Sequence, residues 1–394
     1  MGKNEKIESE SGLIIKMVNE IIKAAVNFNA SDIHLEPEGE RLRIRFRIDG
    51  ILREIANHPI SFLEPLVSRI KVLADLDIAE RRKPQDGRLS YEVEEKELDL
   101  RVSIFPTLYG ENVSLRLLDK AQITLGLEHL GFSPEEFEEY KKMITTPYGI
   151  IFVTGPNGSG KTTTLYSTLH TLNTIEKSII TLEDPIEYKL PLVRQTQIDP
   201  EIGLTFASGL RSLLRQDPDI IMVGEIRDRE TADIAVRAAL TGHLVLTTLH
   251  TNNAVGTINR LVDIGVEPVL ISSATIGIVA QRLVRIVCPE CAEKIEPDPA
   301  VIKEFNLNKY PAINLSKAKG CEVCGQTGYA GRTAIFEILR LDNELKSLII
   351  SRAPYETIFQ LAQTKGMKSL REKGIAKAAS GLTTLEEVLR VTSI

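Results

Sequence analysis

The sequence predicts an α/β protein in which a small N-terminal α+β domain is followed by a second domain built on a parallel sheet. Three observations support this fold class. Residues 1–118 contain segments in which apolar and polar residues alternate, a glycine-rich loop follows an apolar run at residues 149–154, and further apolar runs are separated by segments of helical length. Alternation is typical of half-buried strands, and continuous apolar runs between helices are typical of a covered parallel sheet. A chain of 394 residues is expected to form two or three domains.

The N-terminal domain, residues 1–118, is expected to be an antiparallel sheet preceded by a helix. Residues 13–28 carry apolar side chains at helical spacing. Residues 41–48 alternate arginine with apolar residues, and Asp49-Gly50 then offers a tight hairpin turn. A second hairpin is predicted near residues 94–97, because the alternation resumes beyond it.

A basic stripe lies on the non-apolar face of the strand predicted at residues 41–48. It consists of Arg41, Arg43, Arg45 and Arg47. Nucleic acid could bind such a stripe, but no aromatic residues alternate with it and the formal net charge of the chain is −6. A solvated face, or one turned toward another subunit, is the favoured interpretation.

A linker and a core domain follow. Residues 119–131 have the mixed, glycine-punctuated composition of a linker, and Ser133 begins a capped helix with Glu136 closing the capping box. The core is assigned to residues 132–287. Its four apolar runs are residues 149–154, 178–182, 220–223 and 244–249. Each run ends in polar residues, and ligands of such sheets bind at the carboxyl ends of the strands, so these polar clusters are expected to meet at one site.

The first of these clusters is a phosphate-binding loop. Residues 155–162 read Gly-Pro-Asn-Gly-Ser-Gly-Lys-Thr, directly after an apolar strand and before apolar residues at helical spacing. Its backbone N–H groups would surround a phosphate, Lys161 would reach the β- and γ-phosphates, and the Thr162 hydroxyl would hold magnesium. The residues expected to bind the nucleotide are Gly155, Pro156, Asn157, Gly158, Ser159, Gly160, Lys161, Thr162 and Thr163.

Acidic residues end two of the other strands. Glu225 follows residues 220–223, where such motifs usually have aspartate, and it would contact magnesium through water or polarise the attacking water. Glu183 lies in a second acidic cluster with Asp184 and Glu187. Two carboxylate groups suit phosphoryl transfer, since one can order the metal while the other positions the nucleophile. The alternative for either residue alone is a solvated loop side chain.

Histidines and arginines complete the candidate set. His250, and with less support His243, could sense the γ-phosphate by hydrogen bonding; the alternative is a packed histidine. Arg211 and Arg215 would share one helix face. Arg101 and Arg116 stand on the non-apolar faces of two N-terminal strands. Any of these four could stabilise charge during phosphoryl transfer, although ordinary surface arginine is the alternative for each.

All four cysteines occur in two Cys-x-x-Cys pairs within residues 288–330. Cys288, Cys291, Cys321 and Cys324 match a closed tetrahedral zinc site, which would be structural because it leaves no open coordination position. A redox dithiol and a DNA-contacting zinc ribbon are the alternatives. Residues 331–394 are expected to be helical. No apolar run is long enough to span a membrane and no signal peptide is recognisable, which predicts a cytoplasmic location.

Taken together, these motifs resemble those of the type II secretion and type IV pilus assembly ATPases, a superfamily of secretion motors. The segments that resemble the family's aspartate, Walker B and histidine boxes occur in the family's order after the phosphate-binding loop, and two segments resemble its N-terminal domain. These five segments are residues 181–188, 209–228, 241–252, 31–37 and 81–88. The resemblance covers nearly the whole chain.

This resemblance implies a RecA-like ATPase domain, a homohexameric ring, and ATP held between the N-terminal and ATPase domains. Arg101 and Arg116 match family arginines that reach the phosphates, and further matches important for activity are Arg211, Arg215, Arg227 and Arg260. The four cysteines resemble the assembly branch rather than the retraction motors. The implied partners are an inner-membrane platform protein and a cytoplasmic docking protein, which would hold the motor at the inner face of the plasma membrane. An extra N-terminal docking domain, usual in this branch, is not recognised before the first helix.

Several functions remain open at this stage. Within the family, the alternatives are a motor for a DNA-uptake pseudopilus and a pilus retraction motor. A more distant alternative is an ATPase that translocates nucleic acid, supported only by the arginine stripe and the cysteines. A nucleotide-gated scaffold without turnover is disfavoured by the presence of Glu183, Glu225 and Lys161.

Overall fold

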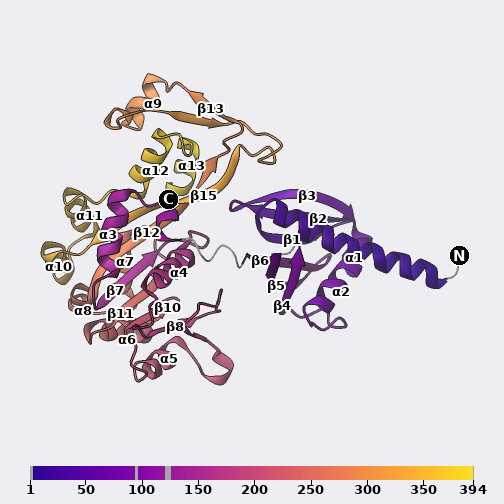
Figure 1. The fold of residues 1–394 in the computed structure, drawn as a ribbon, viewed down its shortest axis with the longest axis horizontal. Helices are drawn as coiled ribbons and strands as arrows, with labels where there is room; N and C mark the ends of the chain where they lie inside the picture. Colours follow the sequence, from indigo (N-terminus) through magenta and orange to yellow (C-terminus); the bar gives the residue numbers. More distant parts are fainter. Residues whose placement is uncertain (1–2, 94–95, 120–125, 394) are drawn as a thin grey trace. The chain divides into compact units, whose positions relative to one another are not determined.

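The computed structural model describes residues 3–93, 96–119 and 126–393, and the chain divides into two compact units, residues 1–122 and 123–394 (Figure 1). Residues 120–125 of the predicted linker (119–131) lie outside the described residues, and a short 3-10 helix spans Leu127–His129 within the rest of it. Among the described helices, none combines the length and hydropathy needed to cross a membrane.

The first unit is a six-stranded antiparallel sheet with two helices packed against one face. The strand order is β3-β2-β1-β6-β5-β4. The elements are α1 (Lys3–Asn27), β1 (Ala30–Glu38), β2 (Arg41–Ile48), β3 (Ile51–Pro59), a 3-10 turn (Ile60–Phe62), α2 (Leu63–Leu73), β4 (Gln85–Val93), β5 (Lys96–Thr107) and β6 (Gly110–Asp119). Apolar residues from both helices and from the strands form one core. The alternation read from the sequence sets this arrangement, because successive strand side chains point to opposite faces.

Most details predicted for this unit are confirmed, with one change at the helix. Leu42, Ile44 and Phe46 of β2 are buried, and β2 pairs with β3 through the expected hairpin. β4 pairs antiparallel with β5, although the turn residues 94–95 lie outside the described residues. Helix α1 begins at Lys3 instead of residue 13. The polar residues before residue 13 therefore extend the helix, and polarity alone does not end one.

The arginine stripe is occupied by acidic partners on the neighbouring strand. Glu36 of β1 accepts hydrogen bonds from Arg43 at 3.2 Å and from Arg45 at 2.5 Å, and Glu38 pairs with Arg41 at 2.7 Å. Burial alone would raise the pKa of Glu36, but the two guanidinium groups hold it below its usual value. The stripe is thus largely neutralised by its own sheet, in line with the solvated-face interpretation.

The second unit is built on a seven-stranded sheet of order β15-β12-β7-β11-β10-β8-β9. The four predicted runs are its adjacent parallel strands β7 (Gly149–Thr154), β11 (Leu244–Leu249), β10 (Ile220–Val223) and β8 (Ile179–Glu183), all fully buried. The short strand β9 (Arg194–Gln197) extends one edge in parallel. At the other edge, β12 (Thr275–Val287) runs parallel to β7, and β15 (Tyr329–Arg340) runs antiparallel to β12.

Strands β12 and β15 correct the sequence analysis. The prediction that residues 331–394 are all helical is wrong up to Arg340, because β15 occupies residues 329–340. Ala334, Ile335 and Phe336 are buried in that strand. A short apolar run of this kind is compatible with a buried strand or a buried helix segment, and only its pairing with a distant strand decides between them.

Helices cover both faces of this sheet (Figure 1). Two of them, α3 (Pro134–Ile144) and α4 (Lys161–Leu172), pack on one face. The predicted capping box between Ser133 and Glu136 is present at the start of α3. The opposite face is covered by α5 (Phe206–Leu213), α6 (Arg229–Leu240), α7 (Ala254–Ile264), α8 (Pro268–Ala274), α10 (Asn343–Ile350) and α11 (Tyr355–Thr364).

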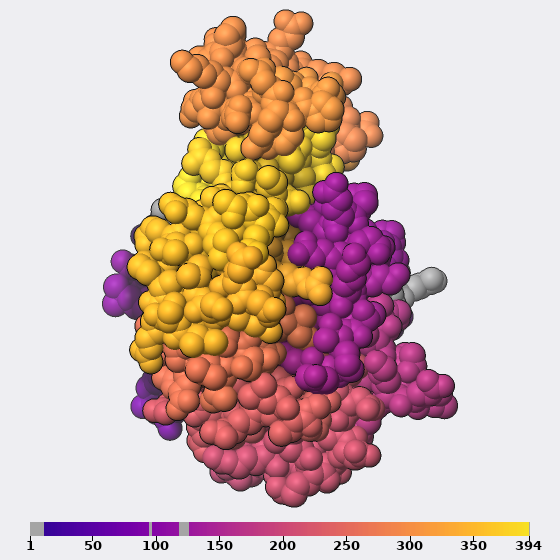
Figure 2. Space-filling model, turned by 90° about the vertical axis from the view of Figure 1, so that its left-hand side faces the viewer, coloured from indigo at the N-terminus to yellow at the C-terminus, as the bar shows by residue number. Residues whose placement is uncertain are grey.

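Residues 288–328 form an arm that leaves the sheet between β12 and β15. Its elements are β13 (Ala292–Ile295), α9 (Pro299–Glu304), a 3-10 turn (Leu307–Lys309) and β14 (Leu315–Ala318), which pairs with β13. Figure 2 shows this arm, in orange, as a lobe beyond the C-terminal helices, in yellow. A small apolar core joins the arm to α12 (Leu370–Ala379) and α13 (Leu385–Thr392).

Candidate functional site

The phosphate-binding loop connects β7 to α4. At two of its glycines, neighbouring atoms leave no room for a Cβ. Gly155 has φ of +153°, and a Cβ added there would lie 2.5 Å from the carbonyl oxygen of Gln281 on β12. Gly160 has φ of +88°, and its Cβ would lie 2.7 Å from Gln281 Nε2. Residues other than glycine rarely adopt these positive φ angles, and here their Cβ atoms would also clash with Gln281. The loop is therefore fitted against β12, a strand that the sequence analysis did not recognise.

Lys161 begins α4 and is buried under the loop. Its Nζ donates to the carbonyl oxygens of Gly155 at 2.9 Å and Pro156 at 3.0 Å. Burial lowers the pKa of Lys161 to about 8, because removal from water disfavours the charged form, although the nearby charge of Glu225 counteracts this effect. The ammonium group is thus held where the loop's backbone would surround a phosphate.

A cavity of about 470 Å³ lies at the carboxyl edge of the sheet, and the polar ends of the strands meet there as expected. Most of the phosphate-binding loop lines it, including Lys161, Thr162 and Thr163. The other walls come from segments after β8, β10 and β11, and the predicted residues among them are Glu183, Asp184, Glu187, Glu225, Arg227 and His250.

Glu225 faces this cavity from the end of β10. One of its carboxylate oxygens pairs with Arg227, and the other lies 3.3 Å from Nε2 of His250. The side chain of Glu225 keeps 15% of its surface exposed. This carboxylate is therefore both oriented by two neighbours and accessible from the cavity.

Glu183, at the end of β8, is in a different environment because it is buried and fully hydrogen-bonded. Its Oε1 accepts from the Thr181 hydroxyl at 2.5 Å and from Gln195 Nε2 at 3.0 Å, and its Oε2 accepts from the Tyr166 hydroxyl. Thr181, Tyr166 and Gln195 were not identified from the sequence. Tyr166 lies one helical turn after the phosphate-binding loop, and this proximity to the loop was the signal available in the sequence.

The two histidines of the fourth strand differ. His250 is exposed, contacts Glu225 and lines the cavity. His243 lies at the other end of β11, where its Nδ1 is 2.9 Å from the carbonyl oxygen of Ala238. His243 is therefore a packing residue, in agreement with the alternative given for it.

The predicted arginines separate into groups. Arg211 forms an exposed ion pair with Glu230, and Arg215 donates to the carbonyl oxygen of Arg211 at 2.8 Å. Neither lines the described cavity, whereas Arg227 does. All three arginines belong to the segment 209–228, so the sequence alone could not show which of them lines the cavity.

Arg101 and Arg116 lie in the first unit and face each other across β5 and β6. They line a concavity of about 480 Å³ together with Arg88, Asp32 and Asp86. Arg116 Nε donates to Asp32 at 3.0 Å, and its side chain remains 60% exposed. The first unit thus presents a cluster of guanidinium groups on one face of its sheet.

Some residues that line this cavity were not identified from the sequence, among them two from β12 and β15. Leu283 and Arg332 line it from β12 and β15, the two strands on either side of the cysteine arm. Beside them, Gln281 accepts a hydrogen bond from Thr164 of α4 at 2.8 Å. The polar pair Gln281-Arg282 interrupts an otherwise apolar run, and this interruption was the available signal.

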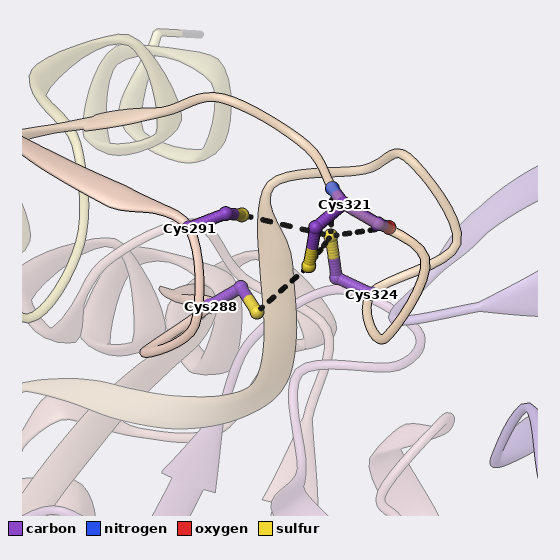
Figure 3. A group of neighbouring side chains, drawn as sticks. All are labelled: Cys288, Cys291, Cys321 and Cys324. Carbon is purple, nitrogen blue, oxygen red and sulfur yellow. Dashed lines mark hydrogen bonds between the residues drawn. The ribbon is translucent and has the colours of Figure 1, made fainter.

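The four cysteines meet as predicted, with one Cys-x-x-Cys pair approaching from each side of the arm (Figure 3). Their sulfur atoms all lie within 4.8 Å of one another. The Sγ–Sγ distances are 3.9 Å for Cys288–Cys321, 3.8 Å for Cys291–Cys324 and 3.7 Å for Cys321–Cys324. Four sulfurs about 2.3 Å from one zinc ion in a tetrahedron stand about 3.8 Å apart, so the spacing fits zinc and not disulfides.

Backbone donors around the sulfurs also suit a bound metal. The N–H groups of Cys321 and Gly328 donate to Sγ of Cys324 at 3.2 and 3.1 Å, and that of Gly320 donates to Cys291 at 3.3 Å. Burial alone would raise the pKa of the Cys324 thiol, but the N–H groups of Cys321 and Gly328 and the neighbouring Cys321 thiol lower it to about 6, whereas burial raises the pKa of the Cys291 thiol to about 12. Donors of this kind stabilise the thiolate form that binds zinc.

Comparison with known proteins connects this geometry to a family. The family model described as type II/IV secretion system protein matches residues 7–390. The type II secretion system protein E of Pseudomonas aeruginosa is 51% identical over 98% of this chain and 76% of that protein. The type IV pilus assembly ATPase PilB of Thermus thermophilus is 49% identical over 98% of this chain, which spans 44% of it.

Solved structures agree. A pilus retraction motor, PilT with bound ADP, matches 95% of this chain and 96% of its own, with a TM-score of 0.64 and 29% identity. The Legionella pneumophila ATPase DotB matches with a TM-score of 0.70 over 96% of this chain and 95% of its own, but at 23% identity it supports the fold alone. From the family model and the high identity over nearly all its length, we conclude that this chain belongs to the type II/IV secretion system protein family.

Proposed function

We propose that this chain is a magnesium-dependent ATPase that powers pseudopilus or pilus assembly, or protein secretion, across the bacterial envelope. The observation that carries the proposal is the joint placement of Lys161, Glu225 and Glu183 in one cavity at the mouth of the phosphate-binding loop. Relatives at 49% identity are named as ATPases of type II secretion and of type IV pilus assembly.

In this proposal the loop residues and Lys161 bind the phosphates of ATP. Thr162, exposed at the cavity, supplies the hydroxyl that would hold Mg²⁺, which neutralises charge on the phosphates when bound. Glu225 orients the attacking water and accepts its proton, because its side chain keeps 15% of its surface exposed, whereas Glu183 is buried among its hydrogen-bond donors. His250 donates toward the γ-phosphate from beside Glu225.

The arginines complete the site in an assembled ring. Arg101 and Arg116 supply positive charge from the first unit, where several guanidinium groups gather around a concavity. Arg211 and Arg215 are exposed on α5 and the residues that follow it, and they serve the site of a neighbouring subunit. Charge developing on the phosphates is stabilised by such guanidinium groups, often from another domain or subunit. A homohexamer is the assembly that we propose.

We also propose structural zinc in the cysteine arm and partners at the membrane. The sulfur spacing of 3.7–3.9 Å supports zinc. An inner-membrane platform protein and a cytoplasmic docking protein would hold the motor at the inner face of the plasma membrane. Assembly is favoured over retraction, because the assembly and secretion relatives are 49–51% identical and the retraction motor is 29% identical.

The decisive experiment pairs two substitutions. Lys161→Ala is expected to abolish hydrolysis and weaken nucleotide binding, whereas Arg101→Ala should abolish hydrolysis and leave binding within about twofold, because Arg101 acts on developing charge. The matched control is Arg41→Ala, which removes an exposed arginine paired with Glu38 on the same sheet. Normal hydrolysis by Arg101→Ala would reject the role of the first unit, and normal hydrolysis by Lys161→Ala would reject the ATPase site.

A further inference from the structure

The hydroxyl of Tyr166 joins two segments of the nucleotide site. Tyr166 lies on α4, one turn after Lys161, and its ring is buried. The hydroxyl donates to Oε2 of Glu183, at the end of β8, and accepts from the N–H groups of Glu187 at 3.3 Å and Tyr188 at 3.5 Å. These hydrogen bonds connect α4, the helix after the phosphate-binding loop, to the acidic segment 183–188, which forms another wall of the cavity.

Gln195, on the edge strand β9, forms further hydrogen bonds to the same segment. Its Nε2 donates to Oε1 of Glu183 at 3.0 Å and to the carbonyl oxygen of Tyr188 at 2.8 Å, while its Oε1 accepts from the N–H of Leu190 at 2.7 Å. The Thr181 hydroxyl supplies a further donor to Oε1 of Glu183. Both carboxylate oxygens of Glu183 are therefore held by protein donors.

The burial of Glu183 makes its three donors important. Glu183 is 3% exposed, and a buried polar group without hydrogen-bond partners is costly, so Tyr166, Thr181 and Gln195 together hold this side chain in place. Burial and the charge of Glu183 both raise the pKa of Tyr166 well above its ordinary value. The protonated form of the tyrosine hydroxyl, which donates to Glu183, is therefore favoured.

The packing around Tyr166 is also specific. Its ring meets the ring of Tyr188 edge to face, with centroids 5.8 Å apart. Asp184 and Glu187 lie between Glu183 and Tyr188 in the sequence, and both line the cavity. A shift of the Tyr166 hydroxyl would move the wall that carries these carboxylates and not only Glu183.

We infer that Tyr166 is a positioning residue for phosphoryl transfer: its hydroxyl holds Glu183 and the segment 184–188 in register with the phosphate-binding loop. This inference rests on the proposed function of the site. Glu183 acts from a fixed, buried position as the second carboxylate, while Glu225 is the more exposed of these two residues. Thr181 and Gln195 share the task, because each supplies an independent donor to the same carboxylate.

The test is Tyr166→Phe, which keeps the ring packing and removes only the hydroxyl. Loss of a hydrogen bond to a charged group should lower kcat about tenfold or more. The KM for ATP should change less than about twofold, because the Tyr166 hydroxyl is already engaged by Glu183 and by the backbone of Glu187 and Tyr188. Thr181→Val removes another donor to Glu183. It should also lower kcat and leave the KM for ATP nearly unchanged.

The matched control is Tyr140→Phe. Tyr140 is fully buried, and its hydroxyl lies 2.7 Å from Thr168 Oγ1 on the same helix α4, away from Glu183. This variant loses an equivalent hydrogen bond to α4, and its kcat should stay close to that of the wild type. Equal losses in Tyr140→Phe and Tyr166→Phe would mean that stability of α4, and not positioning of Glu183, sets the rate.

A double-mutant cycle separates failure of this inference from failure of the proposed function. If Tyr166 acts through Glu183, Tyr166→Phe should have almost no further effect in a Glu183→Gln background. Full additivity of the two substitutions, or wild-type kcat in Tyr166→Phe, would overturn the inference while leaving the ATPase intact. Wild-type protein without magnesium-dependent hydrolysis would instead reject the proposed function.

Discussion

The Nζ atom of Lys161 lies 2.9 Å from the carbonyl oxygen of Gly155, so the loop that it serves also holds its ammonium group in place. Burial lowers the pKa of this lysine to about 8, whereas a lysine in water titrates near 10.4. The positive charge that attracts phosphate is therefore present below pH 8 and is lost as the pH rises through that value.

Nucleotide affinity should accordingly fall at alkaline pH. The Kd of a fluorescent ADP analogue is expected to rise about tenfold between pH 7.5 and 9.5, because ADP itself does not titrate in this range while Lys161 loses its proton. Lys161→Arg should show no such slope, since a guanidinium stays charged. A flat profile in the wild type, or equal slopes in both proteins, would contradict the buried, perturbed lysine.

The contact between the phosphate-binding loop and β12 predicts a steric effect at Gly155. Gly155→Ala should weaken nucleotide binding at least tenfold, because its Cβ would lie 2.5 Å from the carbonyl oxygen of Gln281 and the loop must move. Gly242→Ala is the control, with a positive φ of +108° but nothing within 4 Å of its Cβ. It should lose about 1–2 kcal/mol of stability through backbone strain and bind nucleotide normally. Binding isotherms and thermal unfolding distinguish the two effects.

The cysteine arm should carry one zinc ion per chain. Elemental analysis of Cys321→Ser is expected to show loss of zinc, and protease cleavage within residues 288–328 should become faster, since the metal would hold the two Cys-x-x-Cys segments of the arm together. A strong chelator should have the same effect on the wild type, and added zinc should reverse it. Wild-type protein that holds no zinc after purification under reducing conditions would reject this assignment.

Glu387 of α13 ties the C-terminal helices to the base of the arm. It accepts from Arg285 at 2.8 Å and from Arg390 at 2.7 Å, and it is buried. The Thr384 hydroxyl caps α13 by accepting from the N–H of Glu387, while the Glu387 side chain turns to these arginines. Burial alone would raise its pKa, yet the two arginines hold it below the ordinary value.

Removing this carboxylate should destabilise the protein. Glu387→Gln is expected to cost about 3 kcal/mol at neutral pH, because it leaves a buried guanidinium without its counter-charge. Since the folded pKa is lowered, this contribution is present above about pH 4.5 and is lost as the pH falls through the lowered value. Glu386→Gln changes the exposed neighbour and should be neutral in urea unfolding. Equal midpoints for the two variants would contradict the buried ion-pair network.

The sequence predicted the parts of this fold that depend on local pattern. Alternation identified β2 and the hairpin of β4 and β5 in the first unit, apolar runs identified β7, β8, β10 and β11, and the loop and cysteine spacings identified both candidate sites. The strands β12 and β15 were missed because a buried run is defined by a distant partner, as with Gly277 opposite Arg340. Contacts such as Tyr166 with Glu183 and Gln281 with Thr164 were equally unpredictable, since they join residues that no local period relates.

The measurement that tests the central claim most directly is the steady-state rate of ATP hydrolysis with magnesium as a function of protein concentration, with sizing of the same samples. If neighbouring subunits complete each site, specific activity should rise steeply with concentration as larger assemblies form, and Lys161→Ala should remove it at every concentration. An active monomer with a constant specific activity would contradict the ring motor. Absence of magnesium-dependent hydrolysis in assembled wild-type protein would contradict the ATPase itself.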